Sequence, residues 1–391
     1  MNYLVASDRF FKDAPGGSGR VAWELAKVAH SRGHNVALLS EAPGDGFAPD
    51  EVVEGVRIVR YRAPELAAWN PRRLSVRIAA AARAAQRVLG AQRWDVVHSH
   101  SLATGLGAFE GSPASAERIA TIHSPVVLEQ RINWADGTMV GRLKRLLGEP
   151  AIRRAERRLY ATSVRLSALS QFTIREITHF YGPEIGGRIT CIPWWCDAKR
   201  SRTRAEAKAL LGWPTEAPAI FTLRRLVRRM GIDTLIEAVA QLQGPRPHVY
   251  VGGAGPERPR LETLARERGL ESCVHFLGRL SDSDAALAYE AADLFVLPTR
   301  ALECFGIIAL EAMARGCPVV ASRAGAIPEV VGEILPECLF EPGDAAQLAA
   351  LLQRFVTQEL SLPHPDHLAQ RIHQDYSMSN VSSAYMRLLG L

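Results

Sequence analysis

Short apolar runs alternate with longer segments of helical periodicity along almost the whole chain. The apolar runs are rich in Val, Ile and Leu and end at polar or glycine residues, which predicts buried strands. The segments between them repeat apolar residues every three or four positions, which predicts amphipathic helices. Because strands that alternate with helices form parallel sheets, the pattern predicts an α/β fold with two Rossmann-like, doubly wound domains.

The expected elements fall into two halves of the chain. In the first half we expect strands at Asn2–Ser7, Asn35–Ser40, Val56–Tyr61, Asp95–His100, Arg118–His123, Val164–Ser170 and Ile189–Pro193, with helices at Arg20–Arg32, Pro71–Leu89 and Gln171–Tyr181. Residues 198–217 are polar and open the second half. There we expect strands at Ala219–Leu223, His248–Gly253, Val274–Leu277, Leu294–Leu297 and Pro318–Ser322, and helices at Ile232–Leu242, Pro256–Arg268, Ser283–Ala292, Phe305–Arg315 and Asp344–Thr357, before a helix–break–helix end from His367.

Length and composition agree with two domains and exclude several classes. A chain of 391 residues exceeds the usual single-domain core. No apolar run is long enough to span a bilayer, and the first residues show no signal-peptide pattern. The six cysteines form no C-x-x-C pair, which indicates reduced thiols. We therefore expect a cytoplasmic protein, whose net charge of +6 permits an anionic ligand or membrane surface without requiring either.

The stretch from Thr299 to Pro328 carries the most informative pattern. A loop with Glu303 follows a buried strand and precedes a helix closed by Gly316, so backbone N–H groups at the helix start suit an anion. Glu303 and Glu311 stand eight residues apart, and carboxylates accept hydroxyl hydrogen bonds better than they bind phosphate. The pair suits a phosphorylated polyol such as a nucleotide sugar. The alternative is a helix with one solvated and one N-terminal glutamate.

Other candidate groups follow strand ends. Four arginines lie in RRLVRRMG after the strand Ala219–Leu223, an arrangement that is costly unless an anion neutralises it. His98, His100 and His123 fall at or near the ends of two strands. A metal site is not expected, because no carboxylate accompanies these histidines and none shares helical spacing with another. A hydrogen-bonded strand-end histidine remains the alternative for His123.

The motif E-x7-E, followed by A-x-G-x-P-V-V-A-S-x-x-G-x-x-P-E, resembles the donor-site signature of the family 4 retaining glycosyltransferases of GT-B fold. The resemblance covers nearly the whole chain. It implies that Glu303 holds hydroxyls of the transferred sugar and Glu311 the ribose. The further donor-site contacts that it implies are the backbone of Phe305, Gly306 and Ile307, the glycine turn at Gly16 and Gly17, the turn at Gly253, and Leu280 beside the nucleobase. His123 would lie beside the reacting sugar.

Two positions depart from the family's usual pattern, and a third matches it. Cys304 stands where the family usually has Gly. Arg225 matches the arginine of the family's Gly-Arg-Leu…Lys-Gly pattern, which grips the diphosphate. The lysine of that pattern is replaced by Met230, so Arg229 or Arg228 is expected to supply the second cation.

The resemblance implies a metal-independent enzyme without a cofactor. It would move a hexose-type sugar from a UDP- or GDP-sugar to a hydroxyl of a small-molecule, glycan or lipid-linked acceptor, with retention. The expected domains are 1–195 for the acceptor and 196–370 for the nucleotide sugar, facing across a cleft, with a helix in 371–391 returning to the first domain. Two alternatives stay open: a sugar-nucleotide epimerase of the same plan, and a non-catalytic nucleotide-sugar-binding subunit.

Two basic runs remain. One lies between Gly141 and Arg165, and the other comprises Arg72, Arg73, Arg77, Arg83, Arg87 and Arg93. Either could contact an acidic acceptor or the inner face of a membrane, but solvated Lys and Arg side chains are the favoured interpretation because no Trp- or Phe-rich face opposes them. Nucleic-acid binding is not expected, since no aromatic residues interleave the charges.

Overall fold

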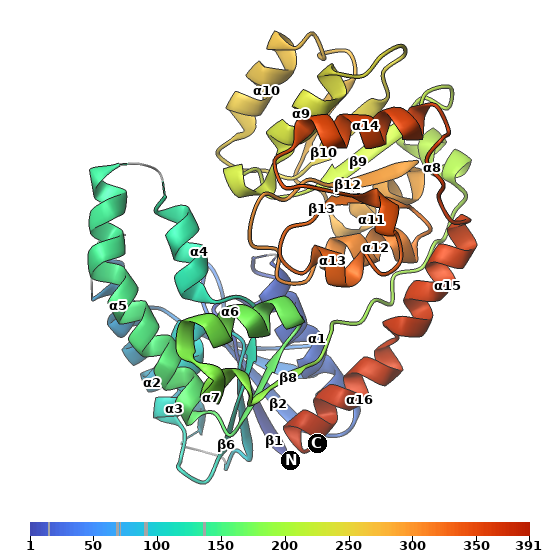
Figure 1. Cartoon of the computed structure of the whole chain (residues 1–391). Helices are drawn as coiled ribbons and strands as arrows, with labels where there is room; N and C mark the ends of the chain where they lie inside the picture. The colour runs from blue at the N-terminus through green and yellow to red at the C-terminus, as the bar shows by residue number, and fades with distance from the viewer. Residues whose placement is uncertain (15, 68–69, 71, 90–92, 136–137) are drawn as a thin grey trace. The chain divides into compact units, whose positions relative to one another are not determined.

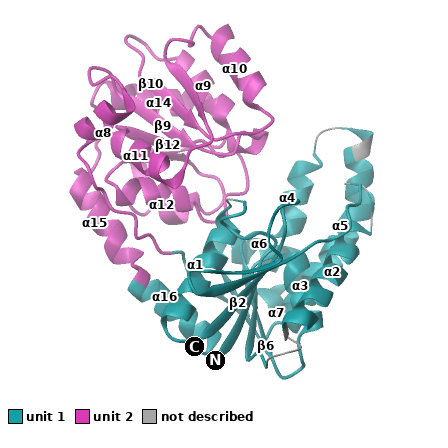
Figure 2. Ribbon diagram, turned by 180° about the vertical axis from the view of Figure 1, so that it is seen from behind, with its two compact units in different colours: residues 1–194, 379–391 teal, residues 195–378 magenta. Residues whose placement is uncertain are grey.

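The computed structural model describes residues 1–391 except 15, 68–69, 71, 90–92 and 136–137. Pro15 of the predicted glycine turn and Pro71 of a predicted helix therefore lie outside the described residues. The chain divides into two compact units, which are Met1–Trp194 with Ser379–Leu391 (unit 1) and Trp195–Met378 (unit 2). Figure 1 labels the helices and strands, and Figure 2 colours the units separately.

Unit 1 is built on an eight-stranded sheet in the order β3-β4-β2-β1-β5-β6-β7-β8. Its pairs are parallel except β3 with β4. The strands are β1 Asn2–Ala6, β2 Asn35–Glu41, β3 Asp50–Val53, β4 Val56–Tyr61, β5 Val96–Ser99, β6 Glu117–Ile122, β7 Arg165–Ala168 and β8 Ile189–Cys191. The helices are α1 Gly17–Ser31, α2 Arg73–Leu89, α3 Leu102–Gly111, α4 Val126–Asn133, α5 Met139–Thr162, α6 Gln171–Tyr181, α7 Pro183–Gly186 and most of α16 Met378–Leu389.

Unit 2 contains a six-stranded parallel sheet in the order β11-β10-β9-β12-β13-β14. The strands are β9 Ala219–Leu223, β10 His248–Gly252, β11 Val274–Gly278, β12 Leu294–Leu297, β13 Val319–Ser322 and β14 Leu339–Phe340. The helices are α8 Arg204–Leu211, α9 Ile232–Ala240, α10 Arg258–Glu267, α11 Asp282–Ala291, α12 Ile307–Ala314, α13 Ile327–Val330, α14 Ala345–Val356 and α15 Pro365–Asp375, with 3-10 turns η1 Arg228–Met230 and η2 Pro336–Cys338.

Each sheet has a point at which its strand order reverses. In unit 1, β1 pairs with β2 on one side and with β5 on the other. In unit 2, β9 pairs with β10 on one side and with β12 on the other. Successive crossover helices pass to opposite faces of the sheet at such a point, which leaves a crevice at the carboxyl ends of the two central strands. We therefore expect ligand sites after β1 and β5 and after β9 and β12.

The predicted α/β class is confirmed, but several predicted elements are wrong in detail. The polar segment 198–217 contains the helix α8, whose capping box joins Thr203 and Glu206. The sequence does carry this signal, since Thr-x-x-Glu is the capping-box pattern. Helix α3 was not predicted either, because it is buried on nearly all sides and so lacks a polar face. The short edge strand β3 was missed as well.

The chain ends in unit 1. Within α16, the buried Tyr385 donates a hydrogen bond to the carbonyl of Ile192 at 3.2 Å, and its ring packs edge-on against Trp194. Trp194 itself is buried. The end of α16 is thereby held against the strand end that closes the unit 1 sheet.

Candidate functional site

The loop between β12 and α12 contains two residues in left-handed backbone conformation. Leu302 has φ of 58° and Gly306 has φ of 94°. Since a helix cannot include a residue at positive φ, α12 begins at Ile307 and not at the predicted Phe305. Glu311 consequently lies only a little more than one turn into the helix, and not two turns as expected from the sequence.

Backbone hydrogen bonds hold this loop in place. The amide of Arg300 donates to the carbonyl of Arg229 at 2.8 Å, and the amide of Ala326 donates to the carbonyl of Glu303 at 2.7 Å. Gly325 lies so close that a Cβ there would be 2.1 Å from the Glu303 carbonyl oxygen. The loop that carries Glu303 is therefore held by two neighbouring segments of unit 2.

The Glu303 carboxylate is paired with an arginine that the sequence analysis did not select. Nη2 of Arg224 lies 2.7 Å from Oε2 of Glu303 and 2.9 Å from Oγ1 of Thr299, and it also contacts the sulfur of Met230. The two side chains are only 7% and 16% exposed. Nε of Arg224 is also buried and has no hydrogen-bond partner among the described residues. A carboxylate and a guanidinium thus meet beyond the carboxyl ends of β9 and β12.

The other arginines of this segment are placed differently. Arg225 is exposed at the end of β9. Arg228 is 80% exposed, with its Nε 3.6 Å from Oε1 of Glu257. Nη1 of Arg229 donates to the carbonyl of Leu302 at 3.1 Å, so Arg229 supports the loop that carries Glu303. The structure brings Arg229 and Glu303 into one site, whereas Arg225 and Arg228 lie on its exposed side.

The predicted turn at Gly253 lies against the same strand end. Its amide donates to the carbonyl of Gly278 at 2.6 Å. Gly253 has φ of 120°, and a Cβ there would be 1.8 Å from the Arg224 carbonyl oxygen, so only glycine permits this approach. Leu280 packs near Gly252, since a Cβ added to Gly252 would lie 3.0 Å from Cδ1 of Leu280. The structure therefore groups Gly253 and Leu280 with Arg224.

The first turn of α12 faces the loop. The amides of Ile307 and Ile308 have no intrahelical acceptors, as at any helix start, whereas those of Ala309 and Leu310 donate to the carbonyl of Gly306. Phe305 is buried and packs edge-on against Tyr376. On α12, the Glu311 side chain lies 3.4 Å from the hydroxyl of Tyr289, which donates to it. The helix start and both glutamates thus lie in unit 2 with Arg224.

His123 belongs to unit 1, where it is the outer member of a histidine row. Its Nε2 lies 2.9 Å from Nδ1 of His100, and Nε2 of His100 lies 3.3 Å from Nδ1 of His98. His98 is further hydrogen bonded to Tyr3 and Thr121, each at 2.7 Å. Burial lowers the pKa of His123 to about 4, and burial together with the charge of His123 lowers the pKa of His98 to about 3. These histidines are therefore neutral at pH 7, as suits hydrogen bonding to a hydroxyl.

Gly16 and Gly17 form the start of α1 in unit 1. Gly17 is the first helical residue, and Gly16 precedes it in an extended conformation. Both are exposed, and a Cβ at either would meet nothing within 4 Å. The predicted helix Arg20–Arg32 thus begins three residues earlier than expected.

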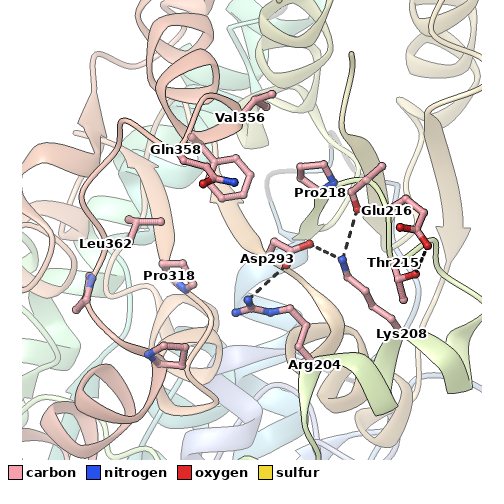
Figure 3. A pocket seen from close by; sticks show the side chains of 14 residues that line it. Arg204, Lys208, Thr215, Glu216, Pro218, Asp293, Pro318, Val356, Gln358 and Leu362 are labelled. Atoms are coloured by element: carbon pink, nitrogen blue, oxygen red, sulfur yellow. Dashed lines mark hydrogen bonds and ion pairs between the residues drawn. The ribbon is translucent and has the colours of Figure 1, made fainter. Parts of the chain in front are cut away.

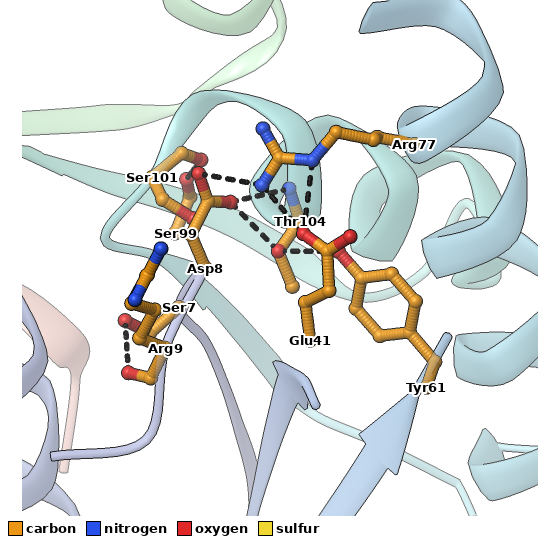
Figure 4. Close-up of polar contacts among 9 residues, drawn as sticks. All are labelled: Ser7, Asp8, Arg9, Glu41, Tyr61, Arg77, Ser99, Ser101 and Thr104. Atoms are coloured by element: carbon orange, nitrogen blue, oxygen red, sulfur yellow. Dashed lines mark hydrogen bonds and ion pairs between the residues drawn. The ribbon is translucent and has the colours of Figure 1, made fainter. Parts of the chain in front are cut away.

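A second charged cluster in unit 1 was missed by the sequence analysis (Figure 4). Asp8, just after β1, accepts hydrogen bonds from the amide and hydroxyl of Thr104 and pairs with Arg77 at 3.2 Å. Burial alone would raise the pKa of Asp8, but Arg77 and the hydrogen bonds lower it. Arg77 also pairs with Glu41 at 2.6 Å. This ionised carboxylate follows β1, while the row of histidines follows β5 and β6, so both lie at the unit 1 crevice.

Another pocket of unit 2 lies at the opposite edge of its sheet (Figure 3). There Lys208 and Arg204 pair with Asp293 at 2.6 Å and 3.4 Å. Asp293 also accepts from the amide of Ala219, the first residue of β9. The amino ends of parallel strands do not form the ligand edge of such sheets, so we assign this cluster a structural role.

The described residues contain no group of three or more His, Cys, Asp or Glu side chains arranged to hold a metal ion. Within the same residues, the structure has no helix that is both long and apolar enough to cross a membrane.

Comparisons with known proteins agree with the fold described above. Residues 203–375 match the family model "Glycosyl transferases group 1", and residues 15–200 match "Glycosyltransferase Family 4". A glycogen synthase of Mycobacterium tuberculosis is 28% identical over 98% of this chain and 93% of its own length.

Two solved structures share the fold along their whole length. Sucrose-phosphate synthase from Thermosynechococcus elongatus has a TM-score of 0.81 at 21% identity, covering 99% of this chain and 97% of its own. Anabaena Alr3699/HepE, in complex with UDP and glucose, has a TM-score of 0.75 at 19% identity, covering 100% and 99%. The chain belongs to the family 4 glycosyltransferases of GT-B fold.

Proposed function

We propose that this glycosyltransferase moves a hexose-type sugar from a nucleoside diphosphate sugar, with UDP or GDP as the nucleotide, to an acceptor hydroxyl with retention of the anomeric configuration. The observation that carries the proposal is the pairing of Arg224 with Glu303 beyond the carboxyl ends of β9 and β12, where the strand order reverses. A fixed carboxylate suits sugar hydroxyls, and a guanidinium beside it suits the diphosphate. The Anabaena structure with UDP and glucose supports a donor of this class.

The demanding step is departure of the nucleoside diphosphate. In the proposed reaction the acceptor oxygen bonds to the anomeric carbon while the bond from that carbon to the diphosphate breaks. The acceptor proton passes to the departing phosphate oxygen on the same face of the sugar. Arg224, Arg229 and the first-turn amides of α12 would stabilise the developing charge, which is the role of preorganised donors in transferase sites.

Glu303 has two tasks in this proposal. Its carboxylate accepts hydrogen bonds from hydroxyls of the transferred sugar, and it orients Arg224 towards the donor. Glu311 would accept from the ribose. Cations and amides replace a divalent metal, so the reaction needs no metal cofactor.

Thermal unfolding with UDP, GDP, ADP and dTDP and their sugars tests the donor site. A ligand at 100 times its dissociation constant stabilises by about 2.7 kcal/mol, which is readily seen as a melting shift. We expect one nucleotide to shift the wild-type protein and to shift Arg224→Ala much less. Arg266→Ala is the matched control, because Arg266 is an exposed arginine of the same unit paired with Glu271. No shift with any nucleotide would contradict the proposal.

Product analysis tests the reaction itself. A transferase releases nucleoside diphosphate only when an acceptor is supplied, whereas an epimerase converts the donor without one. The comparisons do not favour the epimerase or the non-catalytic subunit.

A further inference from the structure

Unit 1 contains a pocket that is formed by residues of that unit alone. Its volume is about 960 Å³, and it opens at the carboxyl ends of β1, β5 and β6, where α2, α4 and α5 form the walls. This is the crevice at which the strand order of the unit 1 sheet reverses. Pockets of this size hold molecules of drug size or larger.

One end of the pocket is polar. It is lined by Asp8 and His123, together with Arg77. Asp8 is held ionised by Arg77, and burial keeps His123 neutral at pH 7, with its pKa lowered to about 4. An ionised carboxylate and a neutral imidazole are suitable partners for a hydroxyl group.

Apolar side chains of α4 and α5 form another part of the lining. Leu143 and Leu147 stand one helical turn apart on α5, line the pocket, and are 54% and 53% exposed. Trp134 from the end of α4 closes this part of the lining against Gly148, where a Cβ would be 2.8 Å from the indole. Half-exposed leucines beside a large pocket leave apolar surface in water, which an apolar ligand would cover.

The same two helices place one basic side chain, Lys144, and two acidic ones, Glu129 and Glu156, in the lining. Helix α5 carries seven Lys or Arg residues and two acidic residues, Glu149 and Glu156. Both acids are engaged, because Glu149 pairs with Arg131 and Glu156 accepts from the amides of Val126 and Val127. Lys144 lines the pocket and has no ion-pair partner among the described residues. Among the Lys and Arg residues of α5, Lys144 is thus the one placed to contact a negatively charged group of a ligand in the pocket.

We propose that this pocket binds the acceptor, and that the acceptor is an anionic amphiphile such as a lipid phosphate. Its hydroxyl-bearing part lies at the Asp8–His123 end, its apolar chain lies along Leu143 and Leu147, and Lys144 contacts its anionic group. That the ligand is the acceptor rests on the proposed function, whereas its chemical class rests on the pocket alone.

Calorimetric titration of the full chain, without donor, tests the ligand class. The probes are octyl, nonyl and decyl phosphate below their critical micelle concentrations, and neutral decyl maltoside. Each added methylene is expected to tighten binding about fourfold while the apolar part of the lining is being covered. Decyl phosphate is expected to bind about threefold tighter than decyl maltoside, because a partly exposed ion pair between Lys144 and the phosphate contributes little more than that. The substitution Lys144→Gln should remove this difference.

Variants of α5 locate the binding. Leu147→Ser is expected to weaken the binding of decyl phosphate about tenfold, because the ligand then buries less apolar side-chain surface at this position. Leu146→Ser is the matched control, because Leu146 is 71% exposed on the same helix and lies outside the pocket. It should leave binding unchanged. Both leucines are exposed, so neither change should prevent folding, which thermal unfolding checks.

Three results would overturn the proposal: affinity independent of chain length, equal loss in Leu146→Ser and Leu147→Ser, or no effect of Leu147→Ser. Equal loss would instead indicate adsorption of the outer face of α5 to an amphipathic surface such as a membrane. The nucleotide shift is measured separately. Binding of decyl phosphate without any nucleotide shift would preserve the lipid-phosphate pocket and remove the proposed transfer.

Discussion

Nη2 of Arg224 lies 2.7 Å from Oε2 of Glu303, and the pair is almost fully buried in unit 2. Arg224 stands at the glycine position, and Met230 at the lysine position, of the Gly-Arg-Leu…Lys-Gly pattern that the family resemblance implies. The guanidinium of Arg224 contacts the sulfur of Met230. The side chains at the two positions that depart from this pattern are therefore in contact. We therefore expect Arg224 to supply the positive charge that the lysine of that pattern would provide.

Arg224→Gly is expected to lower the transfer rate about 10²- to 10³-fold, the usual loss on removing one donor from such a site. It should also destabilise the protein by about 3–5 kcal/mol, because Glu303 is left buried without its partner. Steady-state kinetics and urea unfolding measure the two effects. Arg228→Ala, at an 80% exposed side chain, should change neither.

The double variant Arg224→Gly with Met230→Lys restores the arrangement that the family resemblance implies. Because the lysine would return a cation to the same point, we expect it to recover much of the transfer rate lost in Arg224→Gly. A double variant no more active than the single variant would show that Arg224 does not replace that lysine.

Glu303→Gln is expected to abolish transfer while leaving nucleotide affinity largely intact. The amide keeps the shape of the carboxylate but presents a weaker acceptor to the sugar hydroxyls and no charge to Arg224. Turnover assays and the nucleotide-dependent melting shift separate the two effects. Loss of the melting shift itself would place Glu303 in nucleotide binding and contradict its assigned role.

Gly253→Ala should destabilise the protein by more than about 2 kcal/mol, since strained backbone and overpacking each cost about 1–3 kcal/mol. The added Cβ would lie 1.8 Å from the Arg224 carbonyl oxygen. Gly244→Ala is the matched control, because Gly244 also has positive φ but a Cβ there meets nothing within 4 Å. Urea unfolding should show a clear difference between them. Equal losses of stability in the two variants would mean that the positive φ, and not the close contact with Arg224, causes the whole effect.

Stability should fall as the pH is lowered from about 6.5 towards 4. Burial lowers the pKa of His98 to about 3 and of His123 to about 4 in the folded protein, whereas an unfolded histidine has a pKa of about 6.5. In this window the unfolded chain binds more protons, so the free energy of unfolding rises with pH. Urea titrations at pH 7, 6 and 5 measure the slope, which His123→Gln should reduce. An unchanged slope would mean that His123 takes up a proton in the folded state.

Removal of divalent metal should leave transfer unaffected. In the proposed site, Arg224, Arg229 and the start of α12 supply the charge that a metal would otherwise provide. Assays with and without EDTA, after dialysis against chelator, make the comparison. A loss of rate that Mg²⁺ or Mn²⁺ restores would contradict metal independence.

The amino-acid sequence by itself determined the class of fold and the loop that carries Glu303. Strand and helix periodicities are local properties, so apolar runs and glycine stops predicted most strands of both sheets within one or two residues. Local sequence patterns likewise predicted that Glu303 lies in the loop between β12 and α12. It failed at α3, which is buried all round, and at the start of α12, where the left-handed Gly306 delays the helix.

Only the tertiary structure decided which arginine meets Glu303 and where unit 1 has a pocket. Consecutive residues at a strand end point to opposite sides, so the packing of β9 against β12 turns Arg224 inward and leaves Arg225 exposed. Asp8, His123 and Leu147 likewise share one pocket although they are far apart in the sequence. Their proximity follows from the strand order of the sheet, which depends on long-range pairing that no local pattern encodes.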